Sequence, residues 1–439
     1  MQPSRQSGSK LLQAMKDAFS LPDLRRRILY TLIMLAIFRF IAHVPVPGVD
    51  LSALRSLFDK NQLLGMLDLF SGGAMRNLSV AAMGVYPYIT SSIVMQLLVP
   101  VIPSLQSLSK EGEEGRNKIN QITHWVTVPL AILQGYGQLI LLQNAGVISG
   151  IGLAGEKLLP TAAMVMSMTA GTMFLVWLGE RITENGIGNG ISIIIFGGIV
   201  AGLPEMLGRG FIAGGQTAGL LFFVVLAAAM VVAIVVMTEG QRRVPVQYSR
   251  SSIRYGRMYR QSGSTYIPLR VNMAGMIPLI FAMSIMILPG TLASYFSGGT
   301  GFFANAAKTI GNIFNTTGLV YWALFFLLTV AFAFFYTMVI FQQMNLAETL
   351  QKQGGSVPGI RPGKQTDEYF NQLITRLTWA GAIFLAVIAV APYIAMKASN
   401  LQVIQLSSAG MIIVVGVVLD TMKQLEAQLL MRRYEGFLK

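Results

Sequence analysis

Long apolar runs separated by short polar segments are the feature that most restricts how this chain can fold. A membrane-spanning α-helix needs about 20 apolar residues, and hydropathy along the chain predicts ten such runs. Of the 439 residues, 53% are hydrophobic and only 12% are charged, which leaves little material for a separate soluble core. The predicted spans are 28–46, 78–99, 121–143, 159–178, 187–206, 218–238, 271–290, 319–341, 375–396 and 403–422. The sequence therefore predicts an all-α polytopic membrane protein.

The distribution of Lys and Arg predicts the orientation of these spans. With ten spans, both termini lie on the same side of the membrane. The six segments on that side carry 25 basic residues, whereas the five loops on the other side carry 7. Because basic residues are enriched in cytoplasmic segments, both termini are expected in the cytoplasm. This asymmetry is also the simplest explanation of the net charge of +14.

One cytoplasmic segment, 239–270, is more basic than orientation requires. It contains seven Arg interleaved with Tyr and a single acidic residue. Arg and Tyr suit bidentate phosphate binding and stacking, so one interpretation is a docking finger for a large cytoplasmic partner that is acidic or partly RNA. The other is a solvated loop near anionic lipid headgroups. A second cytoplasmic loop, 342–374, contains a turn rich in Gly and Pro that presents Arg361.

The two halves of the chain share a short pattern. Ten spans divide into two sets of five, and a repeat with an odd number of spans is inverted in the membrane. The corresponding second and seventh spans both contain Gly-x-x-Pro-x-Ile, at 84–89 and 275–280. Paired interruptions indicate a functional site between repeats, where the helices bend or move. A routine kink is the alternative, since Pro and Gly are common in membrane helices.

Residues that carry chemistry are scarce inside the spans. Ion-coupled transporters place ionisable residues in mid-membrane, and here Arg39 is the one clear example, which we expect to pair with a backbone carbonyl or to snorkel outward. The chain has no Cys, no HExxH, no G-x-S-x-G and no intramembrane acidic pair. The glycine run 186–190 lacks a preceding strand and a following Lys, so it is interpreted as a tight turn between the fourth and fifth helices. We therefore predict that the protein is not an enzyme and has no catalytic residue, metal or cofactor. The apolar spans instead favour a pore for a large molecule of varied chemistry.

Six stretches of the sequence resemble the SecY family of protein-conducting channels, which includes the Sec61 alpha proteins. They are long, follow the family's order and extend over nearly the whole chain: FRFIAHVPVPGVD (38–50), LFSGGAMRNLS (69–79), LSKEGEEGR (108–116), GTMFLVWLGERITENGIGNGISIIIFGGIVAGLP (171–204), EGQRR (239–243) and VPGIRPGKQT (357–366). The resemblance implies ten transmembrane helices in two inverted five-helix halves around a central hourglass pore. The expected organisation is a cytoplasmic segment 1–27, halves 28–206 and 207–422, and a cytoplasmic tail 423–439.

The resemblance also implies the function and its residues. The channel would translocate unfolded secretory polypeptides across the inner (cytoplasmic) membrane and release membrane segments sideways through a lateral gate. By motif position, the waist of the pore is a ring of Val85, Ile89, Ile191, Ile195, Ile280 and Ile413. A plug is implied at about 65–76, with Leu67, Phe70, Ser71, Gly72 and Gly73, and the lateral gate includes Pro87, Asn272 and Pro278. Aliphatic side chains exclude water and ions when they meet, yet offer a passing chain no hydrogen bond.

The two basic cytoplasmic loops resemble the family's docking sites for the motor ATPase SecA or a translating ribosome. The implied docking residues are Arg242, Arg243, Arg254, Arg257 and Arg361. SecE and SecG are implied as partners in a heterotrimer, together with signal sequences, nascent chains, SecDF, YidC and membrane lipid. No cofactor is implied.

The sequence departs from the family pattern at three places. Tyr86 stands where Met is common, Ser356 stands where Phe is common, and 342–345 lacks a common Asn/Asp-Pro, so the eighth helix is expected to run further into the cytoplasm. Two other classes stay open. A secondary transporter with inverted repeats is disfavoured by the scarcity of ionisable residues in mid-membrane. An insertion or scaffold factor without a pore would be distinguished by its lack of conductance.

Overall fold

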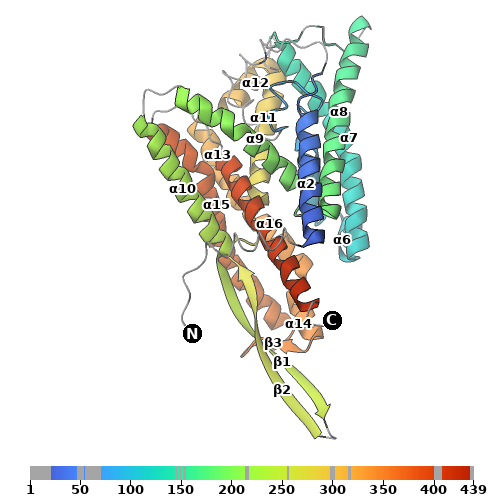
Figure 1. Ribbon diagram of the computed structural model, residues 1–439, viewed down its shortest axis with the longest axis vertical. Helices are drawn as coiled ribbons and strands as arrows, with labels where there is room; N and C mark the ends of the chain where they lie inside the picture. Colours follow the sequence, from blue (N-terminus) through green and yellow to red (C-terminus); the bar gives the residue numbers. More distant parts are fainter. Residues whose placement is uncertain are drawn as a thin grey trace.

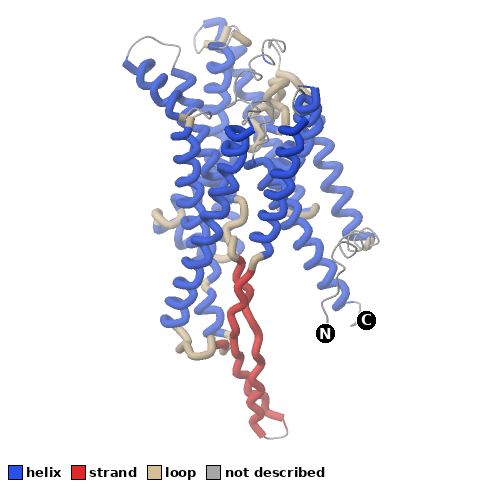
Figure 2. The backbone as a smooth tube through the Cα atoms, turned by 90° about the vertical axis from the view of Figure 1, so that its left-hand side faces the viewer, coloured by secondary structure: helices blue, strands red, loops and turns tan. Residues whose placement is uncertain are grey.

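A bundle of helices forms the body of the molecule, and a long β-hairpin extends from one end of it (Figures 1 and 2). This computed structural model describes residues 21–46, 54, 71–144, 146–148, 150–152, 155–212, 217–254, 257–296, 302–314, 318–399 and 408–435. Every predicted span contains a helix: α2 (Pro22–Ile41), α5 (Tyr86–Leu98), α7 (Glu113–Asn144), α8 (Leu158–Asn185), α9 (Gly190–Ile212), α10 (Thr217–Glu239), α11 (Ile277–Phe296), α13 (Leu319–Met344), α15 (Lys364–Ser399) and α16 (Ser408–Glu435). Shorter helices are η1 (Gly155–Lys157), α6 (Pro103–Lys110), α12 (Phe302–Ile313) and α14 (Leu346–Lys352).

The helices differ in how much of a membrane they could cross. Among the described residues, four helical runs are long and apolar enough to span one, and they contain α7, α8, α13 and α15. A fifth arises if α5 and α6, which meet at 98°, count as one broken span. Shorter apolar stretches lie in α9, α10 and α11, at Gly190–Gly202, Ala228–Glu239 and Ile277–Met286. The structure therefore combines full-length spans with short or interrupted ones.

The two Gly-x-x-Pro-x-Ile patterns have the same local structure, but they begin helices rather than bend them. Gly84 and Gly275 adopt left-handed conformations with φ of +57° and +64°, and α5 and α11 begin two residues later. Pro is then the second residue of each helix, where its missing N–H leaves no helical hydrogen bond unmade. The expectation of a bend at these motifs is therefore wrong, and residues 80–85 of the predicted second span form turns.

The two halves of the chain meet along two seams. α5 and α7 of the N-terminal half contact α11 of the C-terminal half, and α9 contacts α16. α5 and α11 hold corresponding positions in the two predicted repeats, as do α9 and α16. Within the halves, α7 packs on α8, α8 on α9, and α11 and α15 on α13. The arrangement places one pair of corresponding helices at each seam.

The tight turn predicted at 186–190 connects α8 and α9. Two threonine hydroxyls hold it in place. Thr31 of α2 accepts a hydrogen bond from the N–H of Ile187 at 3.2 Å, and Thr183 of α8 accepts one from the N–H of Gly190 at 2.9 Å. The first turn of α9 is thereby fixed against α2 and α8.

The basic segment 239–270 forms a β-hairpin. β1 (Gln241–Arg254) pairs antiparallel with β2 (Arg257–Arg270) along its whole length. β3 (Gly355–Ser356), from the second basic loop, pairs with β1 at Gln247 and Tyr248. The sheet order is β2-β1-β3, so the two predicted docking loops belong to one sheet.

The base of the hairpin is anchored in its own hydrophobic cluster. Val244, Val246 and Leu269 alternate with exposed residues along the strands and are buried. They pack with residues from α13, α14 and α15, including Leu350 and Phe370. The hairpin therefore has a fixed root on the helix bundle, from which its outer part extends (Figure 2).

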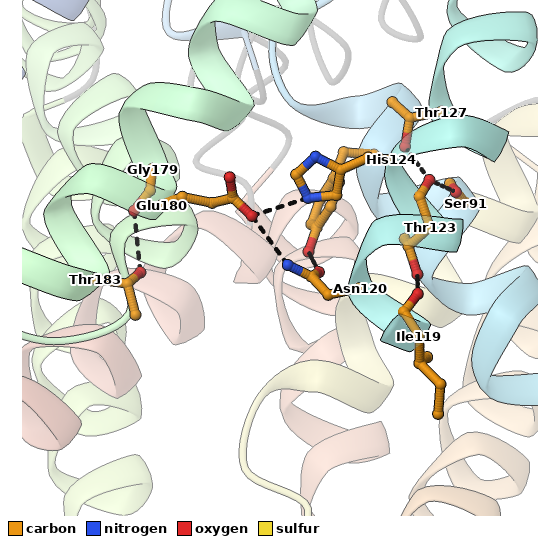
Figure 3. A network of polar contacts seen from close by, with 10 residues as sticks. Ser91, Ile119, Asn120, Thr123, His124, Thr127, Gly179, Glu180 and Thr183 are labelled. Atoms are coloured by element: carbon orange, nitrogen blue, oxygen red, sulfur yellow. Dashed lines mark hydrogen bonds and ion pairs between the residues drawn. The ribbon is translucent and has the colours of Figure 1, made fainter. Parts of the chain in front are cut away.

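Polar contacts tie three helices of the N-terminal half together (Figure 3). The Tyr88 hydroxyl of α5 donates to Asn120 Oδ1 of α7 at 3.2 Å, and Asn120 Nδ2 donates to Glu180 Oε1 of α8 at 2.9 Å. His124 Nε2 of α7 lies 2.9 Å from the same carboxylate oxygen, an ion pair when the imidazole is protonated but without hydrogen-bonding geometry. This network holds α5 to its own half.

Replacing Glu180 by Ala should destabilise the N-terminal half, because Asn120 and His124 lose their common partner in a partly buried site. We expect a loss of about 1–2 kcal/mol of unfolding free energy, measured as a lower apparent melting temperature by Trp fluorescence in detergent. The matched control is Glu184→Ala on the same helix, whose carboxylate pairs with Arg181 at the surface and contributes little. Equal destabilisation by the two substitutions would contradict the role of the network.

Candidate functional site

All six residues of the predicted ring belong to one hydrophobic cluster. Five of them are buried members and Ile191 is a partly buried neighbour packed against them. They come from α9 and from the start of α5 in the N-terminal half, and from α11 and α16 in the C-terminal half. The cluster therefore joins both seams, and corresponding helices of the two halves supply its ring residues: Val85, Ile89, Ile191, Ile195, Ile280 and Ile413.

The chemistry of this cluster is uniform. The ring side chains carry no hydrogen-bonding group, and the five buried ones are at most 8% exposed. They attract one another only by dispersion and by the exclusion of water. Such a contact closes a path to water and ions but forms no specific bond that resists its separation.

The described end of the predicted plug is seated against α2 and α9. Ser71 is fully buried, and its hydroxyl accepts a hydrogen bond from the N–H of Met75 at 3.0 Å. Gly72 has φ of +67°, and a Cβ added to it would lie 2.7 Å from the Cα of Gly198 in α9 and 2.9 Å from the ring of Phe38 in α2. Only glycine fits this close approach.

Arg39, the charged residue within the first predicted span, reaches the same segment. Its guanidinium Nη1 donates a hydrogen bond to the carbonyl oxygen of Gly72, so pairing with a backbone carbonyl is the outcome found. Gly73 follows in another left-handed conformation, with φ of +82°. Two other predicted plug residues, Leu67 and Phe70, lie outside the described residues.

The predicted gate residues lie at the seam between α5 and α11, or beside it. Pro87 and Pro278 are buried in the first turns of these helices. Asn272 lies in the connection from β2 to α11, and its Nδ2 donates to the carbonyl oxygen of Gly275 at 3.1 Å. Among the residues that the structure describes, its amide is therefore bonded within its own segment and not across the seam.

A hydrogen bond that does cross this seam comes from Tyr86, which the sequence singled out only as a departure from the family pattern. The Tyr86 hydroxyl donates to the carbonyl oxygen of Ser284 in α11 at 3.0 Å, and the contact is buried. The only sequence signal was a phenol in an otherwise apolar stretch. A buried Tyr hydroxyl usually has a partner, but nothing local indicates which one.

The hairpin carries four of the predicted docking arginines. Arg242 and Arg243 are exposed on β1, and the Arg243 guanidinium lies 4.9 Å from the ring centre of Tyr266 on β2. Arg254 and Arg257 are backbone partners at the far end of the hairpin. Basic positions are thus present at both the root and the tip of the hairpin.

The fifth docking residue, Arg361, is exposed in the turn that follows β3. Its carbonyl oxygen accepts a hydrogen bond from Thr366 Oγ1 at 2.8 Å, which ties the turn to the start of α15. Ser356, one of the departures, is the β3 residue that pairs with Gln247. Pairing between β1 and β3 therefore places Arg361 beside the root of the hairpin.

The remaining departure, at 342–345, affects where the eighth helix ends. α13 extends to Met344, slightly beyond the predicted end of the span at 341. Asn345 then adopts a left-handed conformation with φ of +41°, and α14 begins at Leu346. The helix is extended as expected, and a left-handed Asn ends it without a proline.

Known proteins match this chain over nearly its whole length. The SecY family profile matches residues 79–422. The protein translocase subunit SecY of Streptomyces scabiei is 42% identical over 445 residues, which cover 98% of this chain and 100% of that protein. The protein translocase subunit SecY of Thermotoga maritima is 39% identical over 437 residues, which cover 97% of this chain and 98% of that protein.

Solved structures share the fold at low sequence identity. One is described as the structure of a protein conducting channel, with a TM-score of 0.60, 14% identity and coverage of 94% of this chain and 96% of that chain. Sec61 in the canine ribosome–channel complex from the endoplasmic reticulum has a TM-score of 0.60, 15% identity and the same coverage of 94% and 96%. They confirm the predicted all-α polytopic membrane fold. With the family profile and the full-length relatives, they lead to one conclusion: the chain belongs to the SecY family.

Proposed function

We propose that this protein is a passive, gated channel for unfolded polypeptides, which opens across the membrane and sideways into it. The observation that carries the proposal is the ring, because six aliphatic residues from corresponding helices of both halves share one cluster. A polypeptide presents side chains of every kind, so its path needs a lining that repels none strongly and retains none. Aliphatic side chains meet that requirement and still exclude ions when they pack together.

The seam between α5 and α11 supports a lateral gate. Both helices begin with the same Gly and Pro pattern, and each contributes a ring residue, Ile89 or Ile280, to the shared cluster. Separation of these helices would open the ring to the lipid on the same side. An apolar signal sequence or membrane segment entering this seam would replace one apolar surface by another, so the exchange costs little free energy.

The seat around Gly72 supports a plug. The backbone at Gly72 lies so close to α9 that no side chain fits between them. Arg39 also donates a hydrogen bond to the Gly72 carbonyl oxygen. A few contacts of this kind position the segment without burying a large area. We infer that the segment preceding them, from about 65, covers the ring and leaves when the channel opens.

The sheet shared by the two basic loops supports a docking surface for a partner that drives the polypeptide through the channel in one direction. The hairpin, β3 and the described end of α16 lie at the same end of the bundle (Figure 1), and the turn that carries Arg361 follows β3 directly. The excess of basic residues predicts that this end, with both termini, is cytoplasmic in the inner membrane. We propose SecA and the translating ribosome as its partners, SecE and SecG as companion subunits, and SecDF and YidC as accessory ones.

Transport by the purified protein tests the proposal directly. Liposomes that contain this protein with SecE and SecG should accumulate a protease-protected presecretory protein when SecA and ATP are added. Omission of ATP should reduce the product to background, because the channel has no proposed energy source of its own. Absence of product with a partner set that is active on the Thermotoga maritima relative would contradict the proposal.

Polar substitutions in the ring should make resting channels leak. Ile280→Ser or Ile413→Ser introduces a hydroxyl that favours water at the constriction, and we expect ion conductance across planar bilayers to rise at least severalfold. Ile388→Ser is the matched control, because Ile388 is buried in the same cluster but belongs to α15 and not to the ring. Unchanged conductance in the ring variants, or an equal leak in the control, would contradict the assignment.

Reversal of charge at Arg361 should prevent SecA from driving transport through the channel. We expect Arg361→Glu to lower SecA-driven transport more than tenfold while leaving membrane assembly intact, because the exposed guanidinium is held in a fixed turn beside the hairpin. Lys364→Glu makes the same change of charge at a nearby exposed position and should retain most of the transport. Normal SecA-driven transport by Arg361→Glu would refute this role.

A further inference from the structure

Polar groups near the seam between α5 and α11 differ in where they form their hydrogen bonds. The Thr90 hydroxyl of α5 donates to the carbonyl oxygen of Tyr86 in its own helix at 3.0 Å. The Asn272 amide before α11 donates to Gly275 in its own segment at 3.1 Å. The Tyr86 hydroxyl, in contrast, crosses from the N-terminal half to Ser284 in the C-terminal half at 3.0 Å.

The helices on either side of this bond are held firmly to their own halves. On one side, the Ser91 hydroxyl of α5 donates to the carbonyl oxygen of Thr123 in α7 at 2.7 Å (Figure 3), in addition to the contacts of Tyr88, Asn120 and Glu180. On the other side, the ring of Phe281 in α11 makes edge contacts with Phe332 and Tyr336 of α13. Parting of the seam would therefore leave these contacts in place and break the Tyr86 bond.

We propose that Tyr86 is a latch on the lateral gate, and that its bond to Ser284 determines how apolar a signal sequence must be to open the channel. The claim rests on the proposed channel function. The bond lies in the same hydrophobic cluster as the ring, and a hydrogen bond there is not replaced by water until the seam has opened.

The chemistry of the incoming segment explains the selectivity. Aliphatic side chains of α5 and α11 that separate from one another pack again on an apolar helix, but such a helix offers the Tyr86 hydroxyl no acceptor. Ser284 is 2% exposed, and its own hydroxyl has no partner in the described structure, so the seam already contains one unsatisfied donor. A weakly apolar signal sequence gains too little burial to offset a second unsatisfied group, whereas a strongly apolar one does.

A thiol at the seam measures the latch without transport. The chain has no Cys, so Ser284→Cys gives a single buried thiol and keeps the backbone carbonyl that Tyr86 contacts. In nanodiscs, Tyr86→Phe in this background should raise the rate of alkylation by N-ethylmaleimide about fivefold, the change expected when one buried neutral hydrogen bond is lost. Equal rates with Tyr and Phe at this position would overturn the latch.

Two Tyr→Phe substitutions serve as controls. Tyr88→Phe removes a hydroxyl from the same helix, but that hydroxyl is bonded within the N-terminal half. Tyr321→Phe removes a buried hydroxyl that has no partner in the described structure, from the same cluster. Neither should change the alkylation rate, and a rise in either equal to that of Tyr86→Phe would overturn the latch. If Tyr86→Phe fails to assemble, Tyr86→Met, which also lacks a hydroxyl, should give the same increase.

Transport with signal sequences of graded hydrophobicity then tests the selectivity. Tyr86→Phe should increase the export of a preprotein with a weakly apolar signal about fivefold and leave a strongly apolar one unchanged. An equal effect on both signals, or none on either, would overturn the link to specificity. Absence of transport by the unsubstituted protein would instead contradict the channel function, while the alkylation rates would still decide whether Tyr86 holds the seam.

Discussion

Contact between aliphatic side chains of two helical halves is the interaction on which the rest of this structure depends. In a bilayer, helices satisfy their backbone groups internally, so the halves are joined through side chains. The ring residues supply contacts that are individually weak and non-directional. Within the halves, directional contacts add to the apolar packing, for example where Glu180 of α8 contacts Asn120 and His124 of α7. Such a molecule can part at its seams without loss of order within each half.

Hydropathy was sufficient to locate the helices but not all of their ends. Every predicted span contains a helix, because burial in lipid requires long apolar runs. The second span was placed too early, because the turns that precede α5 are themselves apolar and buried, with Ala81 and Ala82 almost fully enclosed. Apolar sequence reports burial and not backbone conformation. The predicted spans began before the helices themselves, so Pro87 and Pro278 were expected to bend helices. In the structure they lie in the first turns of α5 and α11.

The other features that could not be predicted depend on contacts between residues far apart in the sequence. Alternation of Val244 and Val246 with exposed neighbours favours a strand, but the alternation is short and lies among arginines that suggested a solvated loop. Nothing near Gly355 indicates that it pairs with β1. The partners of Arg39 and Tyr86 also lie far away in the sequence, at separations of 33 and 198 residues. The ring itself was assigned only through resemblance to a family. The residue types of the site were thus visible in the sequence, whereas contacts between residues far apart in the chain needed the three-dimensional structure.

Connectivity gives the hairpin a direct path to the gate. α10 leads through Gly240 into β1, and β2 leads within a few residues into α11, with the N–H of Val271 bonded to the Gly240 carbonyl at 2.9 Å. Lys423 of α16 pairs with Glu239 at 2.7 Å, and a Cβ on Gly381 of α15 would lie 2.7 Å from the Val271 carbonyl oxygen. The hairpin root is therefore held on two sides. A load on the exposed hairpin would therefore be passed to the start of α11, which follows the left-handed turn at Gly275. In the proposed latch, aliphatic contacts in the ring would yield to such a load gradually, whereas the Tyr86 hydrogen bond would either hold or break, and this difference would give the gate a threshold.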